Sequence, residues 1–209
     1  MGSPFWASML VDHAVLRVWW SNWAEVVPGK MYRSNHPPPF RLRRAVARFG
    51  IRTVVNLRGS APNPSSERSA AEAERLGVAH VPMAFESRGA PHRERILRFQ
   101  EIYRSMAFPA VMHCKSGADR AGLAAGLVVL FEGGTAAAAA RQLSWRYLHV
   151  ALSPTGILDA FFQMYSEQGE GRKAFLDWVR EDYSEAELRR RFRPWRFFSF
   201  INDVLLRRE

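Results

Sequence analysis

The sequence predicts an α/β fold built on a mainly parallel central sheet of four to five strands flanked by helices. Short β-branched or apolar segments alternate with longer segments of helical periodicity, and this alternation is typical of a parallel sheet. The chain has 209 residues, 47% of them hydrophobic, and can bury one substantial core. We expect a helical N-terminal extension over 1–24, a main domain over 25–168 and a helical C-terminal extension over 169–209 packed on the same domain.

The first fifty residues predict a helix, two strands and a second helix. Residues 5–23 carry apolar and aromatic side chains at helical spacing, which is typical of a packing helix. The segment 25–34 predicts two short strands about a Pro-Gly turn. Three prolines at 37–39 start the next helix, whose apolar positions recur up to Phe49 and which Gly50 closes.

Two strand-and-helix units follow. Residues 51–57 predict a β-branched strand, which a polar loop connects to a helix over about 64–77. Residues 79–83 predict the next strand, 84–90 a loop and 91–106 a helix. The inward face of this last helix is expected to consist of Ile96, Leu97, Ile102, Tyr103 and Met106.

The strand predicted over 109–113 ends at Cys114, and an apolar helix follows over 121–131 before a Gly-Gly pair. Gly122 would let this helix pack closely against the sheet. Everything beyond the Gly-Gly pair predicts helix. These helices are expected over 135–145, 154–168 and 172–183, from Ser184 through a capping box, and over 194–208.

The composition is strongly basic, with a formal net charge of +10 and a pI near 10.7. This charge suits a nucleic acid, an anionic membrane surface or a phosphorylated substrate and does not choose among them. Coding composition explains the excess of arginine equally well. With no signal-peptide pattern and no apolar run of about 18 residues, we expect a cytoplasmic protein. Arginines flank the aromatic clusters of both predicted terminal helices, which would also suit a peripheral position on the inner face of the membrane, although such helices more often pack in a core.

Cys114 is the single cysteine, so no internal disulfide can form, and the chain has no cysteine pair for zinc. We expect no metal and no cofactor. A lone cysteine is usually a small buried apolar residue. The segment His113–Arg120 (HCKSGADR) favours chemistry instead, because it connects a buried strand to a helix.

Such a loop turns successive backbone N–H groups toward one point, where the helix N-terminus adds its dipole. It can therefore bind a dianionic phosphate. Arg120 adds a planar fork for two phosphoryl oxygens, and the same positive field stabilises Cys114 as a thiolate that can attack phosphorus. The expected phosphate cradle consists of Lys115, Ser116, Gly117, Ala118, Asp119 and Arg120.

This CX5R loop, with His before the Cys and Gly two residues after the Arg, resembles that of the protein tyrosine phosphatase superfamily, specifically its compact dual-specificity branch. The resemblance covers about residues 26–165. The segments 27–34 and 54–58 are similar to those of atypical bacterial, plant and fungal members. The resemblance implies that the domain over 25–168 is a phosphatase domain.

By this resemblance Cys114 is the nucleophile of a phosphocysteine mechanism, Arg120 binds the phosphate and His113 tunes the thiolate. The loop itself would stabilise the phosphoryl oxygens, so no metal is implied. Arg58 follows a strand that should end near the site, where it would either steer anions or pair with Glu67. The remaining histidines are scattered without metal spacing and are expected to be structural or solvated.

The resemblance leaves two candidates for the general acid. Most relatives carry an Asp on the loop that corresponds to 84–90, where this chain has only one carboxylate, Glu86. Asp119, directly before Arg120, resembles a bacterial subgroup with a CX4DR loop and lipid or phosphoinositide activity. We therefore place Asp119 ahead of Glu86 as the acid. The alternative for Asp119 is a surface carboxylate paired with an arginine.

Several functions stay open from the sequence. The leading hypothesis is hydrolysis of a phosphorylated protein, phospholipid or inositol phosphate. Ala121 stands where many relatives have a hydroxyl that helps the sulfur leave, so the alternative is a phosphate-binding module with little turnover, unless Ser116 substitutes. Sulfur transfer also uses a cysteine in such a loop, but the arginine favours phosphate. Nucleic-acid binding is supported by charge alone and is not expected.

Overall fold

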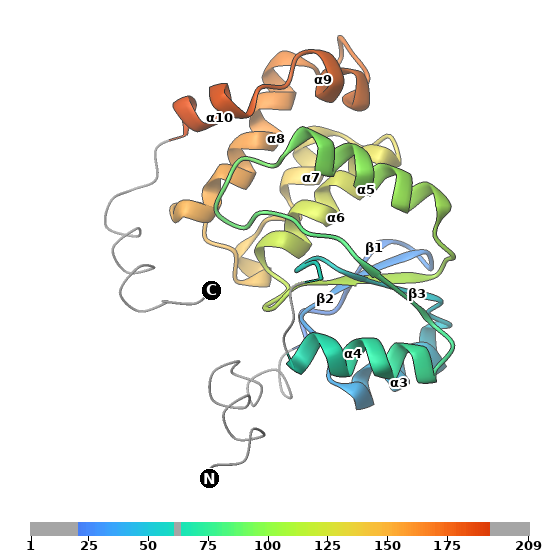
Figure 1. Ribbon diagram of the computed structural model, residues 1–209. Coiled ribbons are helices and arrows are strands. Elements are labelled where there is room, and N and C mark those ends of the chain that lie inside the picture. The colour runs from blue at the N-terminus through green and yellow to red at the C-terminus, as the bar shows by residue number, and fades with distance from the viewer. Residues whose placement is uncertain (1–20, 61–63, 193–209) are drawn as a thin grey trace. The chain divides into compact units, whose positions relative to one another are not determined.

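The computed structural model describes residues 21–60 and 64–192 (Figure 1). The helices predicted over 5–23 and 194–208 therefore lie outside the described residues, apart from 21–23. These three residues are not helical.

The chain forms two compact units, of which the first comprises Met1–Ala84 and Ser105–Gly117 and the second comprises Phe85–Arg104 and Ala118–Glu209. The first unit holds a five-stranded sheet in the order β1-β2-β5-β3-β4. Neighbouring strands from β2 to β4 are parallel, and β1 is antiparallel to β2. The prediction of a mainly parallel sheet in an α/β fold is thus confirmed. The strands are β1 (Ala24–Val27), β2 (Met31–Ser34), β3 (Thr53–Asn56), β4 (Ala79–Pro82) and β5 (Ala110–His113).

Strand β5 is the central strand and leads directly into the predicted phosphate loop. Its last residue, His113, pairs with Ser34 of β2 and with Asn56 of β3. Every residue of β2, β3 and β5 is buried, including the polar or charged residues Arg33, Asn56 and His113. The chain therefore leaves the sheet at Cys114 with a strand end on either side.

Helices α3 (Pro39–Phe49) and α4 (Pro64–Arg75) cover one face of this sheet (Figure 1). Helix α3 begins with a proline, whose fixed φ suits the first helical position. It ends at Gly50, which adopts a left-handed φ of 63° and donates its N–H to the carbonyl of Val46, as predicted. The buried apolar cluster of this unit consists of Tyr32, Leu42, Ala45, Ile51, Val54, Ala73, Val78 and Val111.

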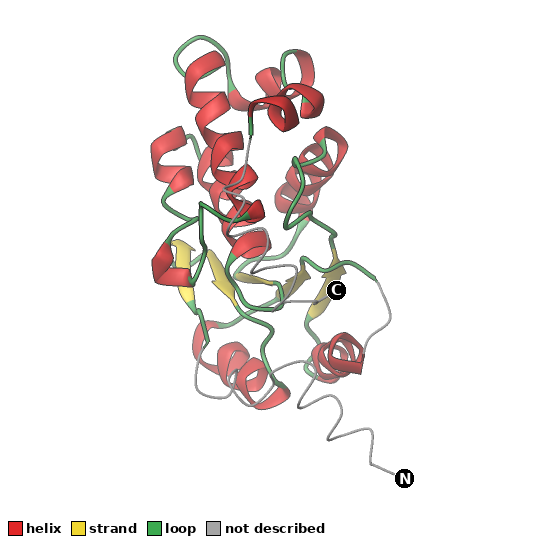
Figure 2. Cartoon of the chain, turned by 90° about the vertical axis from the view of Figure 1, so that its left-hand side faces the viewer, coloured by secondary structure: helices red, strands yellow, loops and turns green. Residues whose placement is uncertain are grey.

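The second unit consists of helices and loops in the described residues (Figure 2). None of the described helices is long and apolar enough to cross a membrane. The described helices are α5 (Arg93–Ser105), α6 (Asp119–Phe131), α7 (Ala136–Ala140), α8 (Ile157–Gln168), α9 (Phe175–Glu181) and α10 (Glu185–Arg191). The last residue of α5, Ser105, belongs to the first unit. Short 3-10 turns lie at Trp145–Tyr147 and Pro154–Gly156.

Helix α6 is apolar on all sides and is buried along most of its length. It begins at Asp119, two residues before the predicted start, and so includes Asp119 and Arg120 in its first turn. A side chain at Gly126 would place its Cβ 2.3 Å from the ring of Phe162. At Gly122 the close neighbour is the side chain of Leu143, so within the second unit this glycine makes room for the segment after α7.

Aromatic rings fill the core of the second unit. Phe161 contacts Phe175, Trp178 and Tyr183 with ring centroids 5.1 to 6.2 Å apart. On α5, Phe99 is fully buried although it was absent from the predicted inward face, whereas Leu97 and Met106 are only partly buried. The buried positions 96, 99 and 103 follow the helical spacing of three and four residues. The prediction was therefore correct for Ile96 and Tyr103, missed Phe99, and included three residues that are only partly buried.

The helix predicted over 135–145 is much shorter than expected. Helix α7 spans only Ala136–Ala140, and Thr135 caps it by accepting the N–H of Ala138. After Ala140 the hydrogen bonds shorten to three-residue steps, including Leu143 N–H to Ala140, and the chain turns. Because Leu143 fills the space beside Gly122, packing outweighs the high helix propensity of this alanine-rich segment. Ser184 is confirmed as the N-cap of α10, since its side chain accepts the N–H of Glu187. The Glu187 carboxylate contacts Gln168 and Arg191, so only this half of the predicted capping box is observed.

Candidate active site

The thiol of Cys114 faces the backbone of its own loop. Cys114 is 3% exposed and follows β5 directly. Its Sγ accepts a hydrogen bond from the N–H of Gly117 at 3.2 Å. The sulfur is thus in contact with a backbone donor of the loop and does not face a purely apolar core.

Three consecutive carbonyls of the loop are tied back to the chain around β2. A trans peptide points its C=O and its N–H in opposite directions, so tying back these carbonyls turns the following N–H groups the other way. This agrees with the bond from Gly117 N–H to sulfur. The three bonds run from the N–H of His36 to Lys115 (3.2 Å), from the Asn22 amide to Ser116 (2.8 Å) and from the Arg33 guanidinium to Gly117 (2.7 Å).

Gly117 is the residue at which the loop cannot carry a side chain. Its φ is +78°, and an added Cβ would lie 2.7 Å from the backbone nitrogen of Asn35 and 2.8 Å from Cβ of Asn22. Both the backbone conformation and the space therefore require glycine. Ser116 is exposed beside it and Lys115 is partly buried.

Arg33 is a functional candidate that sequence reasoning missed. It lies on β2, is fully buried and reaches the loop from 84 positions earlier in the chain. A buried guanidinium beside the loop adds positive charge as well as a hydrogen bond. The sequence did contain one signal for Arg33. It is a charged residue in the middle of a predicted strand, and the other residues of that strand are buried.

His113 is uncharged in this environment. Burial, followed by the neighbouring His36, lowers the pKa of His113 well below its ordinary value. The two rings meet edge to face at 4.8 Å, and His113 Nδ1 lies 3.4 Å from the carbonyl oxygen of Cys114. Any influence of His113 on the thiol would therefore act through the backbone and not through a positive charge.

The second unit holds the end of the predicted cradle, which passes from one unit to the other between Gly117 and Ala118. Ala118 precedes α6 and gives it no side-chain cap, since alanine has no acceptor. The first N–H groups of a helix have no partner within the helix, and its dipole is positive there. This end of α6 therefore offers N–H donors of the kind that bind phosphate.

Asp119 lies in the first turn of α6 and pairs with His149, not with an arginine. His149 is 3% exposed, its Nδ1 lies 2.7 Å from Asp119 Oδ1, and its Nε2 lies 2.6 Å from Asp159 Oδ2. Burial opposes the charged imidazolium, but the hydrogen bonds to both carboxylates outweigh it and raise the pKa of His149 to about 9. His149 thus donates from both nitrogens at neutral pH. In the described residues no group of His, Cys, Asp or Glu is arranged to hold a metal ion.

The guanidinium of Arg120 is oriented by the loop over 84–90. Its Nε donates to the carbonyl of Phe85 at 2.9 Å. Because Nε is fixed, the plane of the guanidinium is set by this contact. Arg120, which the sequence predicts to bind phosphate, is thus held by the backbone carbonyl of Phe85 in the loop that also carries Glu86.

Glu86, the alternative acid, contacts Arg95 of α5 and His92, which directly precedes this helix. Its Oε1 pairs with Arg95 and lies 3.4 Å from Nε2 of His92. Its Oε2 is buried and has no hydrogen-bond partner among the described residues. Glu86 is therefore engaged in ion pairs that fasten the loop to α5.

Arg58 does not form the predicted alternative pair with Glu67 in the described part of the first unit. Its backbone N–H bonds to the side chain of Asn56 at 3.1 Å, and it forms an isolated bridge with Ala84. Its Nη1 is buried without a hydrogen-bond partner among the described residues. Steering of anions is thus the hypothesis for Arg58 that the contacts leave open.

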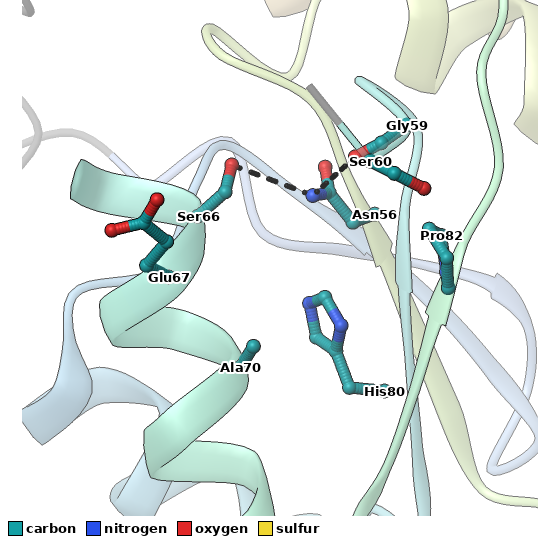
Figure 3. Close-up of a pocket in the computed structure, with 8 residues that line it drawn as sticks. All are labelled: Asn56, Gly59, Ser60, Ser66, Glu67, Ala70, His80 and Pro82. Atoms are coloured by element: carbon teal, nitrogen blue, oxygen red, sulfur yellow. Dashed lines mark hydrogen bonds between the residues drawn. The ribbon is translucent and has the colours of Figure 1, made fainter. Parts of the chain in front are cut away.

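A separate pocket of about 300 Å³ lies between α4 and the ends of β3 and β4 (Figure 3). Burial lowers the pKa of its histidine, His80, so this ring is neutral. Among the described lining residues Glu67 is the only charged one, so this part of the pocket offers no cation for a phosphate. It is lined by Asn56, Gly59, Ser60, Ser66, Glu67, Ala70, His80 and Pro82.

Comparison with known proteins points to one family. The model of a family described as the tyrosine phosphatase family matches residues 20–187. The core catalytic domain of the PP-IP phosphatase SIW14 from S. cerevisiae, in complex with citrate, has a TM-score of 0.58 and 18% identity over 71% of this chain and 88% of that chain. TpbA of P. aeruginosa has a TM-score of 0.57 and 17% identity over 77% and 94%. No curated protein matches the chain. At these identities the structural likeness shows the fold.

Proposed function

We propose, on the premise that this chain belongs to the tyrosine phosphatase family, that it hydrolyses phosphomonoesters through a phosphocysteine formed on Cys114. The observation that carries the proposal is the Gly117 N–H directed at Cys114 Sγ within a CX5R loop. A thiol that served only to fill a core would have no need of a loop amide or of the carbonyl ties that orient it.

In the first step Sγ of Cys114 attacks phosphorus, an S–P bond forms, and the bond from phosphorus to the leaving oxygen breaks. Arg120 and the loop N–H groups hold the phosphoryl oxygens, and Asp119 gives its proton to the leaving oxygen. In the second step water attacks phosphorus, the S–P bond breaks, and a proton from water returns to Asp119. Inorganic phosphate is released and the thiolate is restored.

His149 supports Asp119 as the acid ahead of Glu86. Its Nδ1 binds Asp119 Oδ1, which leaves Oδ2 to exchange a proton with the leaving group. The imidazolium orients Asp119 and also favours its ionised form, so in the proposed reaction the acid is the fraction of Asp119 that carries a proton on Oδ2. His149 is thus a positioning residue in the proposed reaction, and Asp159 holds its other nitrogen.

The substrate class in the proposal is a phosphoprotein, or a phosphorylated lipid or inositol phosphate. Two structural neighbours differ in this respect, since SIW14 is described as a PP-IP phosphatase and TpbA has been crystallised with pTyr. A panel that compares phosphotyrosine peptides, inositol phosphates and phosphorylated lipids would separate the classes. A peripheral position at an anionic membrane would favour the lipid substrates.

Steady-state hydrolysis of p-nitrophenyl phosphate tests the proposal. Wild-type protein is expected to turn over many times, and Cys114→Ser and Arg120→Lys are expected to lose most of the activity. Arg104→Lys is the matched control because Arg104 is exposed on α5. Full turnover in Cys114→Ser would exclude the proposed nucleophile.

A phosphate-binding module with little turnover is the alternative function. The observation that favours it is Ala121, a fully buried residue of the first turn of α6 that offers no hydroxyl to the departing sulfur. Under this alternative the first step gives a burst of one p-nitrophenolate per chain and the second step stalls. Ala121→Ser would then raise the steady rate, whereas rapid turnover in the wild type would exclude the alternative.

A further inference from the structure

The segment 144–153 of the second unit exposes three large apolar side chains. Trp145 is 72% exposed, Leu148 51% and Leu152 54%. Among the described residues, Phe40 of the first unit is the other large hydrophobic side chain with comparable exposure. Single exposed apolar residues need no explanation, but three within eight positions indicate a contact surface.

Hydrogen bonds and buried neighbours hold this segment in shape. The N–H of Leu148 bonds to Trp145 at 2.8 Å, and the N–H of His149 bonds to Ser144 at 3.2 Å. Tyr147 and His149 are buried, so the exposed side chains alternate with anchors. Leu148 has a φ of 63°, a left-handed conformation that costs a leucine about 1–2 kcal/mol. The apolar side chains are thus presented by a fixed turn.

The charges around these side chains are positive. Arg141 and Arg146 are exposed in the same stretch of chain, and no Asp or Glu occurs between Glu132 and Asp159. The whole chain carries a net charge of +10. The two carboxylates that reach this segment, Asp119 and Asp159, are both paired with His149. The apolar side chains therefore lie next to exposed arginines in the sequence, and this combination matches a surface that is apolar inside and anionic at its rim.

We propose that the segment 144–153 docks on an anionic lipid bilayer. Trp145, Leu148 and Leu152 enter the boundary between headgroups and acyl chains, a region that tryptophan prefers because its ring is apolar and its N–H is polar. Arg141 and Arg146 contact the anionic headgroups. A folded protein partner would need carboxylates placed opposite Arg141 and Arg146, because the sequence between Glu132 and Asp159 supplies none. An anionic bilayer offers negative charge along its whole surface, so lipid fits better.

Docking at this segment would bring the lipid surface to the residues that hold the proposed acid. His149 lies between Leu148 and Leu152 in the sequence and binds Asp119. The docking proposal goes beyond the proposed hydrolysis, because binding to a bilayer requires no turnover. The two can therefore fail separately.

Vesicle co-sedimentation of the full chain tests the proposal, with phosphatidylcholine vesicles that contain or lack phosphatidylserine. We expect binding to the anionic vesicles only, weakened at high salt. The triple variant Trp145→Ser, Leu148→Asn and Leu152→Ser is expected to bind at least roughly tenfold more weakly, because it loses the buried apolar area. Asparagine is chosen at 148 because it tolerates the left-handed conformation. Phe40→Ser is the matched control and should bind as the wild type does.

Three further measurements decide the outcome: the folding of the triple variant, vesicle binding by Cys114→Ser, and the oligomeric state of the triple variant. The triple variant should unfold in urea at the same midpoint as the wild type, which shows that it folds whether or not the chain turns over substrate. Cys114→Ser should bind vesicles normally even though it does not turn over. Unchanged vesicle binding by a folded triple variant overturns the proposal, as does a change from dimer to monomer in that variant without a loss of vesicle binding.

Discussion

At the scale of single residues, His149 is the group that links Asp119 to the rest of the second unit. His149→Gln keeps the approximate size but loses the imidazolium that stabilises the carboxylate of Asp119. We expect hydrolysis of phenyl phosphate to fall by roughly tenfold or more and that of p-nitrophenyl phosphate to fall much less, because the better leaving group needs less help from an acid. The measurement is kcat for both substrates.

Two further variants separate positioning from loss of structure. Asp159→Asn leaves Asp119 and His149 in place but removes one of the two carboxylates, so it should show a smaller effect of the same kind. Asp177→Asn removes an exposed carboxylate of α9 and should have no effect. Equal loss for both substrates in His149→Gln would contradict the positioning role.

A substitution of Arg33 tests whether the loop after Cys114 depends on its contact with β2. Arg33→Met removes a buried guanidinium and leaves the carbonyl of Gly117 without this donor. Because the Gly117 carbonyl then loses its tie, the Gly117 N–H is directed less well at Sγ, and we expect alkylation of Cys114 by iodoacetamide at neutral pH to slow by roughly tenfold. Arg33→Lys should recover part of the rate. Wild-type alkylation in a folded Arg33→Met protein would show that the loop does not depend on this contact.

At the scale of elements, the loop between β5 and α6 depends on one left-handed glycine. Gly117→Ala should abolish most of the activity, because the new Cβ meets the backbone nitrogen of Asn35. Gly29→Ala is a matched control, since Gly29 has a similar φ of +65° but nothing within 4 Å of an added Cβ. Both variants carry the conformational cost of about 1–2 kcal/mol, and only Gly117→Ala adds the clash. Equal activities of the two variants would show that the loop can move to accept the methyl group.

The order of strands and helices could be predicted from the sequence because local patterns determine it. Alternation, the Pro-Gly turn and the cap at Gly50 gave the elements of the first unit almost residue by residue. The prediction was wrong about the length of α7 because a distant contact, between Leu143 and Gly122, ends that helix. Local propensity carries no information about such a contact.

The candidate site was predictable only as far as its own loop. Cys114, Asp119 and Arg120 follow one another in a motif with a known spacing, so their chemistry could be inferred. Arg33 and His149 reach the loop from 84 and 30 positions away, and the local sequence does not tell which residues they contact. His149 belonged to the histidines that were expected to be structural or solvated, because its two carboxylate partners come together only through folding.

At the scale of the whole molecule, the raised pKa of His149 makes stability depend on pH. A raised pKa means that the folded chain binds a proton more tightly than the unfolded chain does. The stabilisation is therefore fully present below the unfolded value of 6.5 and is lost as the pH rises to about 9. One pKa unit corresponds to about 1.4 kcal/mol, so the loss is of the order of 3 kcal/mol.

Urea unfolding at several pH values between 6 and 9.5 (roughly the window set by the linkage of folding to protonation) measures this dependence. The wild type should lose stability across the window, and His149→Gln should show a flatter profile. A profile of equal slope in both proteins would mean that another group is responsible.

The central claim, a covalent bond between Cys114 and phosphorus, can be tested by acid quench during turnover. The full chain is mixed with p-nitrophenyl phosphate, quenched in acid within the first turnover, and digested for peptide mass analysis. The account predicts phosphate on the peptide that contains Cys114, and more of it in Asp119→Asn, where activation of water is impaired. Phosphate on any other residue, or rapid turnover without a labelled peptide in a trapped sample, would contradict it.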